Sequence, residues 1–381
     1  PARIILVGGT NGKGSSVEML RALLSGDNVV GTYTSPHVIR YNERIAVNGL
    51  PATDEDIVIA FERVEAARDD VPLTYFEFGT LAALAVFDAA TVDTAILEVG
   101  LGGRLDAVNV VDPDASLITN VSLDHCEWLG DNVEKIGFEK AGIMRPGRPA
   151  VFADPDMPAS VASHAELLGA ELLRAGRDYT WTTEVNARWS WRGERIELSG
   201  LRVPALPGPI QLQNAAGALA LVEALGLDRL LEPTHVNRAF GSLRLPGRMQ
   251  VIEDGQRWLL DVAHNPAAAA ALAAGLQQGK APATVAIVGI LDDKDVEGII
   301  EPLAACVENW IAVTASSPRA IDAAELARRV ANATGKACLI ADSPDMAIER
   351  ARAMAKTGDG VLVTGSFFTV GPFLERLSAR D

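Results

Sequence analysis

A glycine-rich segment near the start of the chain, residues 7–16, limits the fold more than any other feature. An apolar run at 3–7 precedes it, and a run with helical spacing of apolar residues at 15–24 follows it. A glycine-rich turn between a strand and a helix directs backbone N–H groups at a polyphosphate, and the helix N-terminus adds positive potential. Lys13 would reach the β- and γ-phosphates, and a hydroxyl after it would meet a metal ion. The segment predicts a nucleotide-binding α/β domain.

The segment departs from the standard phosphate-loop string G-x-x-x-x-G-K-S/T. Val7 stands at the first glycine position, and Gly14 separates Lys13 from Ser15. A tight turn without a ligand is the alternative interpretation. Such a turn does not require the Asn-Gly-Lys-Gly-Ser series before a helix, so we expect a nucleotide here.

The rest of the first half alternates between apolar and helically periodic runs. We expect strands at 29–33, 94–97, 115–119 and 149–152, and helices at 80–90 and 133–143. This alternation predicts a mostly parallel sheet that is covered on both faces. Residues 179–198 contain three tryptophans among threonines and arginines and predict an antiparallel hairpin. A helix is expected at 211–225, with Asn214 near its start.

A Leu-Pro-Gly-Arg string at 245–248 predicts a domain boundary. After it the alternation restarts, with expected strands at 258–262, 284–290, 310–314, 337–341 and 360–364 and helices at 266–276, 296–305, 323–333 and 344–355. We therefore expect an α/β protein with a P-loop-type ATPase domain at 1–246 and a smaller Rossmann-like domain at 247–381.

Composition restricts the partners of the chain. Its 381 residues suit two domains, and 50 Asp and Glu against 34 Lys and Arg give a formal net charge of -16. Nucleic acids and anionic membranes bind proteins through clustered positive charge, so neither is expected as a partner. Three cysteines cannot form a disulfide framework in a chain of this length, which favours the cytoplasm. We expect a monomer whose partners are small molecules.

Two polar residues are expected at the sheet edge that carries the glycine-rich segment. Glu98 ends an apolar strand, where a carboxylate is costly unless it is paired or binds a metal. His125 follows the next strand, and open α/β sheets bind ligands at the carboxyl ends of their strands. Each has an ordinary alternative, a satisfied carboxylate and a helix cap or core histidine. Together they predict a shared Mg²⁺ ion.

Three further residues are less informative by themselves. Lys140 lies near a helix C-terminus, and the residues alone favour a solvated lysine that interacts with the helix dipole. Asn265 precedes Pro266 and is a plausible N-cap, which explains it without function. Asp261, at the end of an apolar strand in the second domain, has no such explanation.

Five strings together resemble a known family. They are GTNGKGS at 9–15, TSPH at 34–37, LEVGLGGRLD at 97–106, LPGR at 245–248 and DVAHNP at 261–266. They follow the pattern of the folylpolyglutamate synthases, within the Mur ligase superfamily, and the likeness is greatest to the bifunctional dihydrofolate synthase/folylpolyglutamate synthases of bacteria. The resemblance runs from residue 3 to about residue 375 in the order of the family.

The resemblance implies an ATP-dependent amide ligase. ATP would phosphorylate the carboxylate of a pteroate or folate, and L-glutamate would displace phosphate from the acyl phosphate. Charge neutralisation and positioning of the reacting groups would lower the activation barrier. The ATP contacts implied are Thr10, Asn11, Gly12, Lys13, Gly14, Ser15, Asn214, Arg248, Asp261 and His264, of which Lys13 and Arg248 would act on the phosphates.

The resemblance also implies metal and pterin sites. Ser35, Glu98 and His125 resemble ligands of Mg²⁺, and Lys140 matches a lysine that the family carbamylates to serve a second metal. The residues Thr74, Phe76 and Asp106 resemble the pterin site of the bifunctional enzymes. For Phe76 and Asp106 the ordinary alternatives are a core residue and a turn cap.

Other functions remain as alternatives. A monofunctional folylpolyglutamate synthase would share all the phosphate chemistry, while a peptidoglycan-precursor Mur ligase and a silent nucleotide-binding module fit the strings less well. The family begins with a helical segment that closes the pteroate site, so we expect a native segment before Pro1. Phe368 stands where relatives often have histidine.

Overall fold

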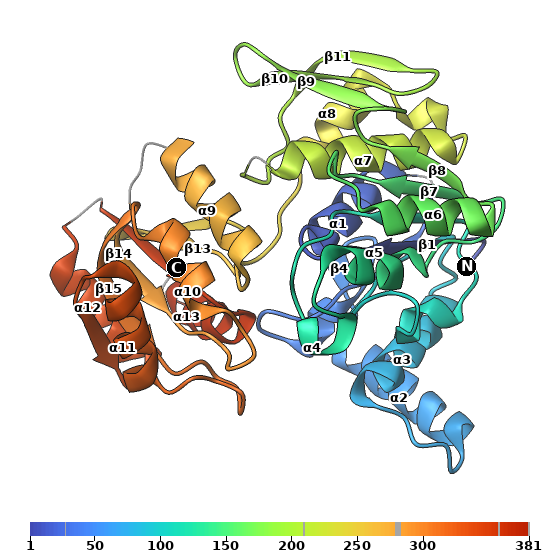
Figure 1. The fold of residues 1–381 in the computed structure, drawn as a ribbon. Helices are drawn as coiled ribbons and strands as arrows, with labels where there is room; N and C mark the ends of the chain where they lie inside the picture. The colour runs from blue at the N-terminus through green and yellow to red at the C-terminus, as the bar shows by residue number, and fades with distance from the viewer. Residues whose placement is uncertain (27, 209, 279–282, 357–358, 380–381) are drawn as a thin grey trace. The chain divides into compact units, whose positions relative to one another are not determined.

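A computed structural model of the protein describes residues 1–26, 28–208, 210–278, 283–356 and 359–379. The chain forms two compact units (Figure 1). The first contains Pro1–Ala205 and Ile210–Arg244, and the second contains Leu206–Pro209 and Leu245–Asp381.

The first unit is built on an eight-stranded sheet with the order β4-β3-β2-β5-β1-β6-β7-β8. Its strands are β1 (Arg3–Gly8), β2 (Val30–Tyr33), β3 (Ile45–Val47), β4 (Leu50–Pro51), β5 (Thr94–Glu98), β6 (Ala115–Ile118), β7 (Pro149–Phe152) and β8 (Glu171–Arg174). In this order, every neighbouring pair from β2 across to β8 is parallel. At the other edge, β3 pairs antiparallel with β2, and β4 pairs antiparallel with β3. The predicted mostly parallel sheet is confirmed.

Helices lie along this sheet. They are α1 (Lys13–Leu24), α2 (Asp54–Arg68), α3 (Tyr75–Ala89), α4 (Cys126–Leu129), α5 (Val133–Ala141), α6 (Ala159–Leu168), α7 (Ile210–Ala224) and α8 (Pro233–Gly241), with short 3-10 turns η1 (Tyr41–Arg44), η2 (Ala107–Val110) and η3 (Asp228–Leu230). α1 packs against α7 and α8, α2 against α3, and α5 against α6.

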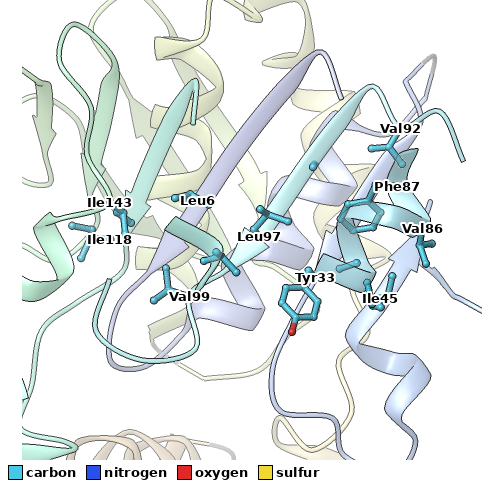
Figure 2. Packing of buried hydrophobic residues seen from close by; sticks show 14 of the residues in the cluster. Leu6, Tyr33, Ile45, Val86, Phe87, Val92, Leu97, Val99, Ile118 and Ile143 are labelled. Atoms are coloured by element: carbon cyan, nitrogen blue, oxygen red, sulfur yellow. The ribbon is translucent and has the colours of Figure 1, made fainter. Parts of the chain in front are cut away.

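Alternate residues of the strands supply two layers of core, because successive side chains of a strand point to opposite faces. Leu6, Leu97 and Ile118 belong to one buried cluster, together with Phe87 of α3 and Ile143 after α5 (Figure 2). On the opposite face, Leu117 packs against α7, where a Cβ added at Gly217 would lie 3.3 Å from it. The apolar strands are therefore covered on both faces, as the alternation predicted.

The tryptophan-rich segment forms a three-stranded antiparallel sheet rather than a single hairpin. β9 (Thr180–Glu184) and β10 (Arg188–Arg192) form the expected pair, and β11 (Glu197–Arg202) adds to β10. Trp189 and Trp191 are buried, and the indole N–H of Trp191 donates to the carbonyl of Ala216 in α7. The alternating tryptophans thus fix this small sheet onto the helix.

The second unit has a six-stranded sheet with the order β12-β13-β17-β14-β15-β16. Its strands are β12 (Gln250–Asp254), β13 (Gln256–Leu260), β14 (Ala283–Val288), β15 (Val307–Val313), β16 (Cys338–Ala341) and β17 (Gly360–Thr364), and its helices are α9 (Pro266–Gln278), α10 (Val296–Leu303), α11 (Ala323–Thr334), α12 (Pro344–Met354) and α13 (Phe367–Ser378). In this order, every neighbouring pair from β13 through β17 to β16 is parallel. At the edge, β12 pairs antiparallel with β13.

Two further features concern the cysteines and the helices of the chain. All three cysteines carry free thiols. Among the described residues, no helix combines the length and the apolar character needed to cross a membrane.

Candidate active site

The candidate residues of the first unit gather at one edge of its sheet. β2, β5, β1 and β6 are parallel neighbours, so their carboxyl ends meet at that edge. Ser35 follows β2, Glu98 ends β5, the phosphate loop (residues 8–14) follows β1, and His125 follows β6. The edge is the one at which open α/β sheets bind their ligands.

Two glycines of the phosphate loop have backbone geometry that other residues rarely adopt. Gly9 has φ +138°, and a Cβ there would lie 1.8 Å from the hydroxyl of Thr119. Gly12 has φ +85°, and a Cβ there would lie 2.8 Å from Oδ1 of Asn214. The loop is therefore pressed against β6 on one side and α7 on the other, and only glycine fits at both positions.

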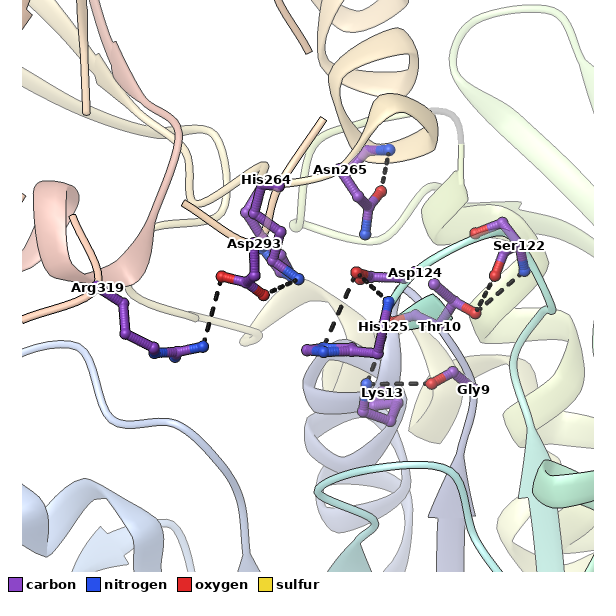
Figure 3. A network of polar contacts seen from close by, with 12 residues as sticks. Gly9, Thr10, Lys13, Ser122, Asp124, His125, His264, Asn265, Asp293 and Arg319 are labelled. Atoms are coloured by element: carbon purple, nitrogen blue, oxygen red, sulfur yellow. Dashed lines mark hydrogen bonds and ion pairs between the residues drawn. The ribbon is translucent and has the colours of Figure 1, made fainter. Parts of the chain in front are cut away.

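Hydrogen bonds hold the phosphate loop in place. The amides of Thr10 and Asn11 donate to Asn120 at 3.0 Å, one to its carbonyl and one to its side chain. Thr10 also bonds to Ser122 through its hydroxyl, and the Lys13 ammonium donates to the carbonyls of Gly9 and Thr10 at 3.1 Å (Figure 3).

α1 begins at Lys13 rather than at the expected Ser15, because Gly12 in the left-handed region serves as its N-cap. The first amides of a helix have no acceptor within the helix. The amides of Lys13, Gly14 and Ser15, rather than those of Thr10 and Asn11, therefore offer the anion-binding end.

Glu98 and Ser35 are in direct contact. Glu98 is 5% exposed, and its Oε2 accepts a hydrogen bond of 3.1 Å from the amide of Ser35. A buried carboxylate at this edge, bonded to the backbone of a serine, provides the kind of hard oxygen ligand that Mg²⁺ prefers. Among the described residues no three His, Cys, Asp or Glu side chains converge, so protein ligands of these kinds do not complete a cation site.

His125 occupies the N-cap position of α4 without capping it. Its φ is +51°, and its side chain makes no cap hydrogen bond. Its amide donates to Oδ1 of Asp124 at 2.9 Å, and its Nε2 lies 3.9 Å from the same oxygen. The left-handed backbone therefore turns the imidazole away from the ordinary capping role.

Lys140 is buried, which corrects the interpretation as a solvated lysine. It is 4% exposed, and its Nζ donates to the carbonyl of Gly9 at 3.0 Å. Burial, with Lys13 nearby, lowers the pKa of Lys140 to about 7, while Asp124 and Asp106 oppose the shift. Its position four residues after the buried Ile136 was the missed signal, because residues i and i+4 share a helix face.

The three proposed pterin residues also have structural roles. Thr74 caps α3 by accepting from the amide of Glu77 at 3.3 Å. Asp106 accepts from the amides of Leu101 at 2.8 Å and Val108 at 3.0 Å, which confirms the turn cap as one of its roles. Burial raises the pKa of Asp106, although these amides oppose the shift.

Phe76 lies at the margin of the core rather than inside it. Its ring is half-buried, with its centroid 5.8 Å from that of Tyr33. A Cβ added at Gly100 would lie 2.7 Å from the ring. Phe76 is thus packed against the backbone that leads to Asp106, and part of its ring surface remains open to solvent.

Asn214 and Gln211, near the start of α7, contact the phosphate loop and the first turn of α1. Asn214 is fully buried and donates to the side chain of Gln211 at 3.2 Å, and Gln211 donates to the hydroxyl of Ser15 at 3.4 Å. Sequence reasoning missed Gln211 and Asn120, because their importance depends only on contacts with a loop far away in the chain.

In the second unit, Arg248 and His264 meet at an aromatic ring. The Arg248 guanidinium lies 5.1 Å from the ring centroid of Phe367, and the His264 ring lies 5.9 Å from it. Asp261 accepts from the amides of Met249 and Ala263 at 2.9 Å. Burial raises the pKa of Asp261, and Arg248 opposes the shift.

Other residues of this unit have simpler explanations. Oδ1 of Asn265 accepts from the amide of Ala268 at 2.9 Å, which confirms the predicted cap. Phe368 is 39% exposed; its amide donates to the hydroxyl of Ser366 at 3.1 Å, and its carbonyl accepts from the amide of Ser316 at 3.0 Å. Asp293 and Arg319 form an ion pair at 3.4 Å (Figure 3).

Comparison with known families accounts for both units. The Mur ligase middle domain matches residues 7–222, and the Mur ligase glutamate ligase domain matches residues 247–367. The chain belongs to the Mur ligase family.

Individual relatives narrow the family further. The dihydrofolate synthase/folylpolyglutamate synthase of Escherichia coli K12 is 40% identical over 99% of this chain and 87% of its own length. The E. coli FolC structure in complex with DHPP and ADP has a TM-score of 0.93 at 38% identity, covering 99% of this chain and 89% of that one.

Another relative was solved with AMPPNP. It is a bifunctional folylpolyglutamate synthase/dihydrofolate synthase with Mn, AMPPNP and L-glutamate bound, with a TM-score of 0.90 at 40% identity, covering 99% of this chain and 89% of that one. This Mur ligase is therefore an ATP-dependent ligase of the dihydrofolate synthase/folylpolyglutamate synthase group.

Proposed function

We propose that this enzyme adds L-glutamate both to dihydropteroate and to tetrahydrofolates, at the expense of ATP. The observation that carries the proposal is the shared sheet edge, at which the phosphate loop and Glu98 lie beside the segment that bears Asp106. The relatives solved with DHPP and ADP, and with AMPPNP and L-glutamate, support the same set of substrates.

The reaction proceeds through an acyl phosphate. A carboxylate oxygen of the pteroate attacks the γ-phosphorus of ATP, the bond to the β-phosphate oxygen breaks, and ADP leaves. The amine of glutamate then attacks the acyl carbon, and the tetrahedral intermediate expels phosphate and loses a proton. Lys13 and the first amides of α1 stabilise the charge that develops on the transferred phosphoryl group.

Ser35, Glu98 and His125 are the residues that would hold Mg²⁺. Bound there, the ion would neutralise phosphate charge and polarise the reacting oxygens. Lys140 would serve a second Mg²⁺ as a carbamate. Its lowered pKa fits this role, because an amine with a pKa of about 7 has a large neutral fraction near neutral pH, whereas an ordinary lysine is almost wholly charged, and the neutral amine is the form that takes up CO₂.

The remaining assignments belong to the same proposal. Thr10, Asn11, Gly12, Gly14, Ser15, Asn214, Arg248, Asp261 and His264 would contact or support the nucleotide. Thr74, Phe76 and Asp106 would bind the pterin, with Asp106 accepting from its N–H groups and Phe76 offering an apolar face. The enzyme would be a cytoplasmic monomer of two domains, 1–246 and 247–381.

The decisive experiment supplies dihydropteroate, glutamate, Mg²⁺ and ATP to the enzyme and measures dihydrofolate and ADP. We expect both products in equal amounts, and extension of tetrahydrofolate in a parallel reaction. Extension of tetrahydrofolate without dihydrofolate would identify a monofunctional folylpolyglutamate synthase. If neither dihydropteroate nor tetrahydrofolate causes ADP release, the protein lacks this ligase activity.

A further inference from the structure

The segment between β5 and β6, residues 99–112, carries Asp106 and is called here the Asp106 loop. It lies against the C-terminal turn of α5, which carries Lys140. We propose that Arg145 is a positioning residue that fastens the Asp106 loop to this turn and thereby sets the affinity for the pterin-bearing substrate. The inference rests on the proposed function.

The guanidinium of Arg145 spans the two segments. Toward the Asp106 loop, Nη2 donates to the carbonyls of Asn109 at 3.1 Å and Val111 at 3.0 Å, and to the Asn109 side chain at 3.1 Å. In the segment that follows α5, Nη1 donates to the carbonyl of Met144 at 3.1 Å. Arginine alone among the side chains carries five N–H donors in a rigid plane, so it can serve this many carbonyls at once.

The ion pair of Arg145 is a minor part of this contact. Nε lies 3.1 Å from Oδ1 of Asp112, but the Asp112 side chain is 96% exposed. Exposed ion pairs contribute little because water screens them. The carbonyl contacts therefore explain why an arginine stands at this position.

Asn109 makes a second connection between the same segments. Its Nδ2 donates to the carbonyl of Arg104 in the loop at 3.1 Å and to the carbonyl of Gly142 at 3.0 Å. The amide of Arg104 donates to the carbonyl of Glu139 at 2.8 Å. A Cβ added at Gly103 would lie 2.9 Å from the carbonyl of Lys140, so the two backbones touch.

The position of Asp106 depends on this contact. Its two oxygens accept hydrogen bonds from amides of its own loop, those of Leu101 and Val108. Its carboxylate therefore moves with the loop, and Arg145 fixes the loop relative to Lys140. Because small displacements of positioning groups cost large factors in binding and rate, loosening this contact should weaken capture of the pterin.

The test compares Arg145→Met with Arg148→Met. Arg148 follows in the same segment; its side chain is 55% exposed, and its guanidinium forms an ion pair with Asp114 at 3.4 Å. We expect Arg145→Met to raise the KM for dihydropteroate and its Kd, measured by calorimetry, about tenfold or more. The KM for ATP should stay within about twofold, and Arg148→Met should change neither constant.

A loss of stability alone would not produce this split between the two substrates. If Arg145→Met does not fold, Asn109→Ala removes the second connection and must reproduce the rise in the dihydropteroate KM. An unchanged KM and Kd for dihydropteroate, or an equal rise in the KM for ATP, would overturn the inference. If the wild type binds dihydropteroate but does not turn it over, the proposed function fails, and the Kd values still decide the role of Arg145.

Discussion

Lys13 and Lys140 both donate to the carbonyl of Gly9, yet their surroundings give them different chemistry. Lys13 is partly exposed in the phosphate loop, where the proposed role needs an ammonium group beside the phosphates. Lys140 is enclosed by the end of α5, where burial favours the neutral amine. The same residue type therefore suits the proposed phosphate-binding cation in one place and the proposed carbamate in the other.

At the residue scale, Lys13→Ala should abolish most turnover while leaving the fold intact. Removal of one charge contact to the transferred phosphoryl group should lower kcat by about 10²–10³-fold. ADP release with dihydropteroate and glutamate measures the loss, and thermal unfolding checks the fold. Lys135→Ala, which removes an exposed lysine paired with Asp131, is the control and should be silent. Near wild-type turnover in a folded Lys13→Ala enzyme would contradict the assignment of the loop.

Lys140 should give the enzyme a specific dependence of stability on pH. Because the folded pKa is about 7 and the ordinary value is 10.5, the unfolded chain binds more protons between these values. The free energy of unfolding should therefore rise with pH across this interval, by about 1.4 kcal/mol per pH unit at most.

Urea unfolding of wild type and Lys140→Met at pH 7, 8 and 9, in CO₂-depleted buffer, measures this rise. The rise should be smaller in Lys140→Met, which has no proton to exchange, and should persist in Lys135→Met. Identical slopes in all three proteins would show that Lys140 does not titrate in this interval.

At the scale of elements, α2 and α3 begin alike and permit a matched comparison. Thr53 and Thr74 each form a capping box, with Asp56 and Glu77 respectively. Only Thr74 belongs to the proposed pterin site. A threonine that also contacts substrate should therefore affect binding as well as helix stability.

Thr74→Ala and Thr53→Ala should each lower the free energy of unfolding by about 1 kcal/mol. Thr74→Ala should in addition raise the KM for dihydropteroate, whereas Thr53→Ala should not. Chemical unfolding and steady-state kinetics on the two variants provide both readings. If both variants have the same KM for dihydropteroate, Thr74 acts only as a helix cap.

At the scale of the whole molecule, metal should be needed for turnover but not for folding. Among the described residues, no group of three His, Cys, Asp or Glu side chains could hold a structural ion. Treatment with EDTA should therefore stop ligation, and added Mg²⁺ or Mn²⁺ should restore it, while the Tm stays unchanged. A fall in Tm on chelation would reveal a metal site that stabilises the fold.

The sequence by itself determined the order of strands and helices and the positions of the main candidate residues. Apolar runs at 94–97 and 115–119 predicted strands that the structure confirms to within a residue or two. The short strands β3 and β4, the strands β8 and β12 and the helices α2, α6 and α8 were not predicted. The periodicity of apolar residues and the residue types that form turns are local properties of a chain, so they can be recognised without knowledge of distant contacts.

The tertiary structure alone decided which groups are buried and which are already bonded. It enclosed Lys140 beneath the phosphate loop, bonded the amides of Thr10 and Asn11 to Asn120, and placed Arg248 and His264 beside Phe367. More than a hundred residues separate Lys140 from Gly9 and Phe367 from Arg248. Burial and hydrogen bonding depend on such distant partners, and no local pattern of residues records which partners the folded chain brings together.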